Sequence, residues 1–274
     1  MTRVVTLGYL TLDSTPLETL DAAAVAGFRS VGIGITARRY GDPYVAEVLG
    51  NRRAIAAIRR RIADTGLRLS NISAYHLYPD VPADTLQQIL DTTAELGSRI
   101  VVVNNYIEDA GALAAALSRF CEHAATLDIR VALEFMRYSR LKTLGAACDL
   151  MATVGMPNLG LLVDSLHLAR SGGTPDEVKA LRPGSIVFAQ LCDAKAAPAD
   201  TDDATLRQEA RTGRLYPGDG VLPLRAFVAA LPADCEIEYE VPRQDLGDLT
   251  MTERARIAMS VCRHFLGREN VGAA

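Results

Sequence analysis

The sequence contains no tryptophan, few aromatic residues of any kind (5%) and only four histidines. About half of its 274 residues (49%) are apolar, so alanine, valine and leucine must carry the packing of a large core. No apolar run approaches the roughly 18 residues that a membrane-spanning helix needs. The net charge of −4 and the pI near 5.6 argue against a nucleic-acid surface, which is normally basic. We therefore expect a globular protein with no membrane and no nucleic-acid partner.

Paired cysteines are also missing. The five cysteines are widely spaced, odd in number and form no CxxC motif, at positions Cys121, Cys148, Cys192, Cys235 and Cys262. This pattern indicates reduced thiols of a cytoplasmic protein, not a disulfide framework or a zinc ribbon. The first residues, MTRVVTLGYL, do not have the form of a signal peptide. We therefore expect a cytoplasmic location.

Short apolar runs alternate with alanine- and leucine-rich segments of helical period along the whole chain. The strand candidates are residues 3–9, 30–36, 67–73, 99–105, 130–136, 159–165, 185–191 and 236–242. The helical candidates between them include 17–27, 52–66, 85–97, 110–127 and 144–155, and four of these stop at a glycine. Such alternation predicts parallel strands joined by helical crossovers.

Eight such units in a chain of this length predict an α/β fold with a single (β/α)₈ TIM barrel, spanning residues 1–274 as one domain. The alternative is an open, doubly wound sheet. Open sheets often carry a GxGxxG or GxxxxGK[ST] nucleotide motif, and the sequence has neither in the expected place. The longest stretch expected to be irregular is 195–220, between the seventh and eighth strands.

Four consecutive strand candidates end in an oxygen-bearing side chain: Glu134, Asp164, Gln190 and Glu240. Active sites of such barrels form where the strands end, at their C-terminal face. Taken singly, each residue has a structural interpretation. Asp164 could cap the helix that follows it, and Gln190 could be a satisfied core amide. In the eighth strand, Glu236 and Glu238 share a face with Glu240 and could be paired or lie at the solvated bottom of the barrel.

Taken together, the four residues favour a metal site. Three converging carboxylates would repel one another, and buried carboxylates must be paired or coordinate a metal. Three carboxylates and an amide oxygen form a hard donor set that suits Mg²⁺ or Mn²⁺ better than zinc. The sequence therefore predicts one divalent cation, Mn²⁺ or Mg²⁺, with Co²⁺ as a further candidate.

The segments VALEFM, LLVDSLHLARSGG, FAQLCDA, YPGDG and EYEVP resemble, in order and spacing, the xylose-isomerase-like barrel superfamily of sugar phosphate isomerases and epimerases. The resemblance covers nearly the whole chain. It implies that Glu134, Asp164, Gln190 and Glu240 hold the cation. It also implies that His167 lies near the substrate and that Arg214 contacts it. Barrels of this family often pair, so a homo-oligomer is compatible with it.

Two positions depart from the usual isomerase pattern. The seventh strand carries Gln190 in place of a histidine, and the second strand carries Gly32 in place of a carboxylate. The form QLCDA followed by RLYPGDG is closer to the 3-dehydroshikimate dehydratases of the superfamily. The arginine expected after the third strand for a substrate carboxylate is replaced by the loop AYHLYPD, which contains Tyr75, His76 and Tyr78.

The resemblance implies an isomerase or epimerase of a small polyhydroxy ketone, a sugar or sugar-like compound. An α-proton would be abstracted and a metal-stabilised enediolate formed. Glu134 and Glu240 would act as ligand and base, and His167 as a third catalytic residue. A dehydratase of the 3-dehydroshikimate type is the alternative, with His167 protonating the departing hydroxyl.

The residues expected to bind substrate are His76, Arg214, Arg137 and Tyr75. Arg38, Arg39 and Arg243 also follow strand ends, where each could bind a carboxylate or phosphate or simply be solvated. Two other classes of protein were considered. A DNA-repair endonuclease of the superfamily would need more histidines and a basic groove. A non-catalytic binding or partner subunit is a further alternative.

Overall fold

The computed structural model describes residues 3–267. Eight parallel strands pair in sequence order, and β1 closes the barrel against β8 with Val5 opposite Ile237. The strands are β1 (Val5–Leu7), β2 (Ser30–Ile33), β3 (Arg68–Leu77), β4 (Ile100–Asn105), β5 (Arg130–Glu134), β6 (Leu159–Asp164), β7 (Ile186–Leu191) and β8 (Ile237–Tyr239). The predicted closed barrel is confirmed, and the open sheet was the wrong alternative.

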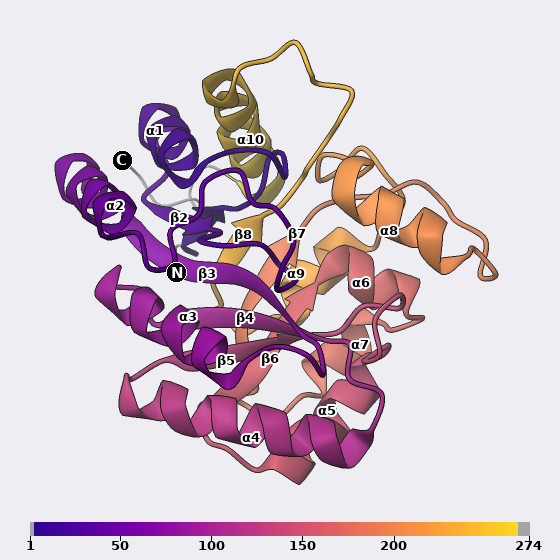
Figure 1. The fold of residues 1–274 in the computed structure, drawn as a ribbon. Helices are drawn as coiled ribbons and strands as arrows, with labels where there is room; N and C mark the ends of the chain where they lie inside the picture. The colour runs from indigo at the N-terminus through magenta and orange to yellow at the C-terminus, as the bar shows by residue number, and fades with distance from the viewer. Residues whose placement is uncertain (1–2, 268–274) are drawn as a thin grey trace.

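Helices cover the outside of this barrel, with α3, α4 and α5 along the lower edge of the view in Figure 1 and α8 on the right. Within residues 3–267 the helices are α1 (Pro16–Ala26), α2 (Arg52–Thr65), α3 (Ala83–Glu95), α4 (Ala110–Thr126), α5 (Leu144–Val154), α6 (Ser165–Arg170), α7 (Pro175–Lys179), α8 (Asp203–Thr212), α9 (Leu224–Ala230) and α10 (Met251–Leu266). None of them is long and apolar enough to cross a membrane. All five cysteines are free thiols, as expected.

Glycines end several of these helices, as the sequence predicts. Gly27, Gly66 and Gly155 adopt left-handed backbone conformations directly after α1, α2 and α5. Their amide groups donate hydrogen bonds back to the last turn of each helix. A residue with a Cβ is disfavoured at such positive φ angles, so glycine sets where the chain turns back toward the barrel.

Several boundaries differ from the sequence predictions. β2 is shorter than 30–36, because its register to β3 shifts between Val31 and Ile33 and the pairing then ends. β3 continues beyond residue 73 to Leu77 because β4 pairs with it there. The stretch 195–220 was wrongly expected to be irregular throughout, since it contains α8. That helix is mostly polar and buries only Leu206 and Ala210, so few apolar residues mark it in the sequence.

The barrel interior has an apolar layer and, nearer the C-terminal ends of the strands, a polar layer. Ala74, Val102, Ala132, Leu162 and Phe188, from β3 to β7, form one buried cluster separate from the main core. Two residues further along each of these strands lie His76, Asn104, Glu134, Asp164 and Gln190. Because strand side chains alternate with period two, these polar residues also face inward, at the C-terminal end of the barrel.

Candidate functional site

A cavity of about 420 Å³ opens at the C-terminal ends of the strands, within the size range of small-molecule sites. Glu134, His167, Gln190, Arg214 and Glu240 all line it. Asp164 is completely buried beside them. The strand-end residues predicted from the sequence therefore meet in one place.

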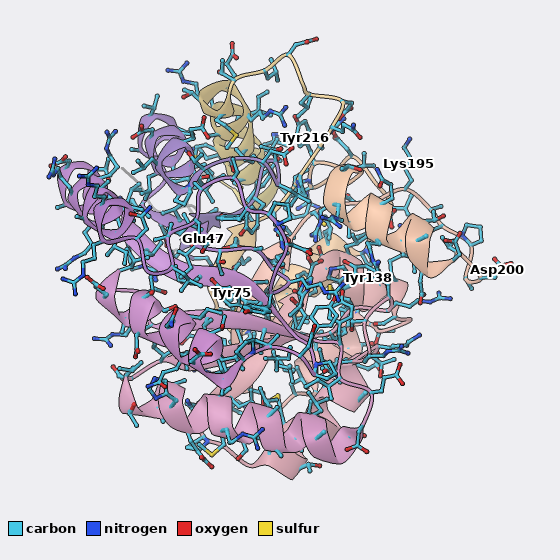
Figure 2. The ribbon with its side chains drawn as sticks, in the orientation of Figure 1. Glu47, Tyr75, Tyr138, Lys195, Asp200 and Tyr216 are labelled. Atoms are coloured by element: carbon cyan, nitrogen blue, oxygen red, sulfur yellow. The ribbon has the colours of Figure 1, made fainter. Side chains whose placement is uncertain are left out.

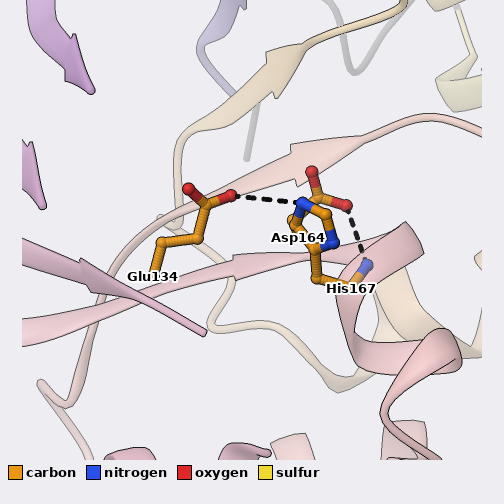
Figure 3. Close-up of side chains that lie close together, drawn as sticks. All are labelled: Glu134, Asp164 and His167. Atoms are coloured by element: carbon orange, nitrogen blue, oxygen red, sulfur yellow. Dashed lines mark hydrogen bonds and ion pairs between the residues drawn. The ribbon is translucent and has the colours of Figure 1, made fainter. Parts of the chain in front are cut away.

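Glu134, Asp164 and His167 lie close together and form a group of possible metal ligands, as Figure 3 shows. One potential ligand atom from each lies within 4.8 Å of the other two. The Nε2 atom of His167 is 3.7 Å from Oε1 of Glu134, and its backbone amide donates to Oδ1 of Asp164 at 3.3 Å. His167, which the sequence predicts to be a catalytic residue, therefore also lies among the possible metal ligands.

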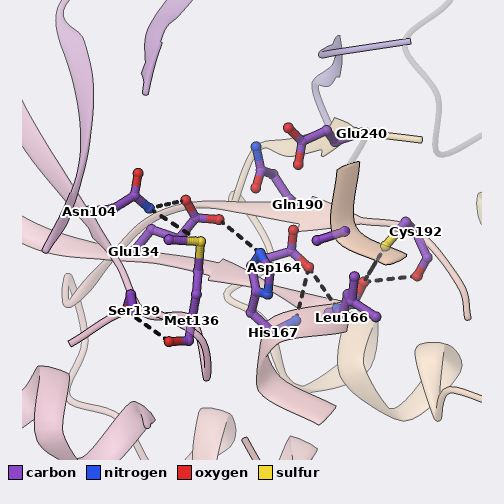
Figure 4. A network of polar contacts seen from close by, with 12 residues as sticks. Asn104, Glu134, Met136, Ser139, Asp164, Leu166, His167, Gln190, Cys192 and Glu240 are labelled. Carbon is purple, nitrogen blue, oxygen red and sulfur yellow. Dashed lines mark hydrogen bonds and ion pairs between the residues drawn. The ribbon is translucent and has the colours of Figure 1, made fainter. Parts of the chain in front are cut away.

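Asp164 has two functions at once. Its Oδ1 atom accepts a hydrogen bond of 2.6 Å from the backbone amide of Leu166 and so caps α6. Its Oδ2 atom accepts one of 2.6 Å from the guanidinium of Arg214. The capping interpretation and the site interpretation of this residue are therefore compatible. Capping also fixes the carboxylate so that its second oxygen points into the polar network of Figure 4.

Arg214 joins two of the carboxylates. Besides Asp164, its guanidinium contacts Oε2 of Glu240 at 3.0 Å, and the side chain is almost fully buried. Burial disfavours its charge, but Asp164 and Glu240 outweigh that cost and raise the pKa of Arg214 further above its ordinary value. Arg214 thus stays charged and compensates part of the negative charge in the cavity.

The compensation is incomplete. Burial, and next the Asp164 and Glu240 carboxylates, raise the pKa of Glu134 to about 8. Burial also raises the pKa of Glu240, although Arg214 opposes it. For Asp164, burial is outweighed by Arg214, and its pKa lies below the ordinary value. Burial lowers the pKa of His167 to about 4, so its ring is neutral. Where the strands end, three carboxyl groups face the single guanidinium of Arg214, so ionisation of all three would leave an excess of negative charge there that a cation would offset.

Gln190 supplies a further oxygen. Its Nε2 amide donates to Glu238 at 2.7 Å, while its Oε1 atom is buried without a hydrogen-bond partner among residues 3–267. Buried polar atoms without partners are rare and call for an explanation. Carboxylate oxygens, an unsatisfied amide oxygen and the nearby imidazole nitrogen together fit a divalent cation.

Glu238 was expected to be paired or to lie at the solvated bottom of the barrel. It lies instead inside the barrel, and among residues 3–267 it forms no ion pair with a basic side chain. It is 1% exposed and also accepts a hydrogen bond of 2.6 Å from Asn71. Two glycines make room for it: a Cβ would lie 2.8 Å from its side chain at Gly8 and 2.5 Å at Gly32. Gly32, where relatives were expected to carry a carboxylate, thus gives space to a carboxylate from β8. Glu236 is paired as expected, with Arg68 at 2.6 Å.

Two of the four predicted substrate-binding residues line the cavity, and two do not. His76 and Arg214 line the cavity. Tyr75 precedes His76 on β3 and points to the other side of the strand, into a neighbouring pocket with Glu47. The guanidinium of Arg137 donates to the carbonyl of Ala199 at 2.7 Å, outside the cavity lining.

Other residues of the cavity had not been singled out for this role. Asn104, next to the last residue of β4, donates a hydrogen bond to Glu134, and the strand-end rule could have found this position. Tyr9 and Tyr138 come from the ends of β1 and β5. Arg207 and Arg211 come from α8, whose helical nature the sequence pattern did not reveal.

The chain matches the family of xylose isomerase-like TIM barrels over residues 20–259 and belongs to that family. The resemblance inferred from the strand-end motifs is therefore confirmed. Its named relatives are enzymes, as the sequence predicts for this protein.

Among the curated relatives is a 3-dehydroshikimate dehydratase of Pseudomonas aeruginosa, 28% identical over 237 residues, which are 82% of this chain and 35% of that protein. This chain thus spans about a third of the length of that relative. An inosose isomerase of Bacillus velezensis is 26% identical over 63% of this chain and 64% of its own length. Among solved structures, an IOLI protein with a bound zinc atom superposes with a TM-score of 0.80 at 17% identity, covering 97% of this chain and 98% of the other.

Proposed function

We propose that this protein is a divalent-cation-dependent enzyme that removes the proton next to the carbonyl of a small polyhydroxy ketone. The proposal is carried by the meeting of Glu134, Asp164, Glu240 and the unpartnered oxygen of Gln190 at the strand ends. These four residues would hold the cation, with Mn²⁺ or Mg²⁺ as first candidates and Co²⁺ next. The nearby imidazole nitrogen of His167 is a further donor, and the zinc found in the IOLI protein makes Zn²⁺ worth including in metal tests.

When bound, the cation would act as a Lewis acid toward the oxygens of a hydroxyketone. The side chains of the protein do the rest. Glu134 and Glu240 approach the cavity from β5 and from the end of β8, so either carboxylate can accept a proton from a carbon held between them. Asn104 orients Glu134 through its hydrogen bond. Arg214 keeps Asp164 ionised.

The proton can then have two fates. Return to another carbon or face gives isomerisation or epimerisation, the reaction that the strand-end motifs first suggest. Loss of a β-hydroxyl gives dehydration instead. Similarity to the dehydratases extends over more of this chain than similarity to the inosose isomerase, 82% against 63%, which favours dehydration as the second candidate. For this reaction we assign His167, whose Nε2 atom lies 3.7 Å from Glu134, to pass the proton taken up by Glu134 to the departing hydroxyl, a role that requires its ring to be free of the cation.

The test is incubation of the Mn²⁺- or Mg²⁺-loaded protein in D₂O with ketoses, inosose and 3-dehydroshikimate. Deuterium in recovered substrate or in an epimer supports the isomerase, and an aromatic product absorbing in the ultraviolet supports the dehydratase. The Glu134→Gln variant serves as the control and should do neither. A protein that binds no divalent cation and changes none of these compounds would refute both reactions and support the alternative of a non-catalytic partner subunit.

A further inference from the structure

A cluster of arginines stands at the rim of the same cavity. Arg38 follows β2, and Arg207 and Arg211 lie four residues apart on α8, so both face the same side of that helix. All three line the cavity. Their positive charges therefore stand above the negative charges of the strand ends.

These three arginines form no ion pair with an acidic side chain in the part of the chain that the structure describes. Within residues 3–267, no carboxylate oxygen lies within 4.0 Å of a guanidinium nitrogen of Arg38, Arg207 or Arg211. Arg38 instead lies over the ring of Tyr9 at 4.6 Å, and Arg207 over the ring of Tyr138 at 5.5 Å. Figure 2 shows Tyr138 beside α8, above the strand ends. The rings hold the guanidinium groups in place and leave their N–H donors available.

His76 lines the same cavity as the three arginines. Its ring faces the cavity, and burial first, then Arg38, Arg211 and Arg207, lower the pKa of His76 to about 3. The three guanidinium groups come from two separate segments, and all of them line the same cavity as this ring. The neutral imidazole adds a polar atom there and no charge of its own.

The helix that carries two of the arginines is itself anchored. Glu209 lies between them on α8 and forms two hydrogen bonds, of 2.8 and 2.7 Å, with Arg170 at the end of α6. Both side chains of this pair are largely buried. Leu206 and Ala210 pack α8 against the barrel. Arg207 and Arg211 therefore lie on a helix that is anchored to the rest of the barrel.

We propose that Arg38, Arg207 and Arg211 bind an anionic group, a carboxylate or a phosphate, carried by the substrate at the end away from the reacting ketone. Guanidinium groups recognise both oxyanions through paired N–H donors. The inference rests on the proposed function, because only that function makes the bound anion a substrate. It narrows the substrate to an acidic polyhydroxy ketone, which includes 3-dehydroshikimate and excludes a neutral inosose.

The test compares matched probes that differ only in the anionic group. Shikimate is compared with methyl shikimate for a carboxylate, and ribose 5-phosphate with ribose for a phosphate. Calorimetric dissociation constants are measured with the Mn²⁺-loaded wild-type protein and with the double variant Arg207→Ala/Arg211→Ala. Arg225→Ala is the matched control, because Arg225 lies over Phe265 and lines no part of the cavity. Both α8 arginines are exposed, so the double variant should fold normally.

We expect the wild-type protein to bind the charged member of one pair at least about tenfold more tightly than its neutral counterpart. The pair that shows this preference identifies the group as carboxylate or phosphate. The preference should vanish in the double variant and persist in Arg225→Ala. Equal affinities within both pairs, no measurable binding of either charged probe, or a preference that survives in the double variant would each overturn the proposal.

A cation titration separates this result from the proposed function. Charge preference in a protein that binds no divalent cation would support the arginine site and refute the metal-dependent chemistry. Cation-dependent turnover without any charge preference would refute the arginine site alone.

Discussion

The side-chain amide of Gln190 donates a hydrogen bond of 2.7 Å to the carboxylate of Glu238, its register partner on the adjacent strand. This bond occupies the nitrogen of the amide and turns the oxygen away from Glu238. The oxygen is then the atom left without a partner beside the strand-end carboxylates. Glu238 therefore positions the oxygen that we propose as a ligand of the cation, without lining the cavity itself.

We predict that Glu238→Ala both destabilises the fold and weakens cation binding. The change leaves the amide donor of Gln190 without an acceptor and leaves Asn71 with only the long 3.4 Å bond to Ser70, at about 1–3 kcal/mol for each buried group. Urea unfolding measures the stability, and the rise in Tm on adding Mn²⁺ measures the binding. Exposed Glu95 is the control, and Glu95→Ala should change the free energy of unfolding by less than about 0.5 kcal/mol. An unchanged Mn²⁺ response in Glu238→Ala would contradict the positioning role.

A second prediction compares alanine substitutions at two glycines, Gly32 inside the barrel and Gly145 on helix α5. In Gly32→Ala the new Cβ would lie 2.5 Å from Glu238 and 2.9 Å from Asn71, so the buried network must shift, at about 1–3 kcal/mol. In Gly145→Ala, near the start of α5, the Cβ meets nothing within 4 Å, and the higher helix propensity of alanine should stabilise by up to about 1 kcal/mol. Thermal unfolding of the two variants should therefore move in opposite directions. Equal shifts would show that Gly32 is not needed for space.

Cation binding should appear as thermal stabilisation. A cation held at a hundred times its dissociation constant adds about 2.7 kcal/mol to the free energy of unfolding. We expect Mn²⁺, Mg²⁺, Co²⁺ or Zn²⁺ to raise Tm after treatment with a chelator, and the effective ions to identify the metal. Glu134→Gln should remove most of this rise. It should not lower Tm without metal, because it relieves repulsion with Asp164 and Glu240. If no cation raises Tm in the wild-type protein, the metal site is refuted.

The stability of the protein should fall in mild acid because of His76. Its pKa is about 3 in the folded chain, against an ordinary value of 6.5. Between these values the unfolded chain holds a proton that the folded chain lacks. The free energy of unfolding therefore decreases as the pH drops below about 6.5, by up to about 1.4 kcal/mol per pH unit from this residue. Urea unfolding at pH 7, 6 and 5 should show a shallower decrease in His76→Gln than in the wild-type protein. Parallel curves would mean that His76 does not contribute.

The strand-end residues could be predicted because strand geometry is local. Once Glu134, Asp164 and Gln190 were assigned to consecutive parallel strands, period two and the common direction of the strands brought them to one end of the barrel. The pairing of Asp164 with Gln190 in register follows from the same geometry. The barrel itself followed from the alternation of the segments.

What the sequence did not reveal depends on contacts between distant segments. The burial of Glu238 requires the space left by Gly8 and Gly32, which lie more than 200 residues earlier in the chain. The helix α8 is held by contacts with other segments, through buried Leu206 and Ala210 and through the Arg170–Glu209 pair. Neither effect has a signal within the segment concerned.

The separation of charge in the cavity has a consequence for stereochemistry. The carboxylates lie at the strand ends and the unpaired guanidinium groups at the rim, so the cavity has a negative floor and a positive entrance. An asymmetric ligand with one acidic end is then expected to enter in a single orientation. One face of its reacting carbon would always be turned toward Glu134 and the other toward Glu240. The choice between epimeric products would be made by the direction of entry, before any bond is broken.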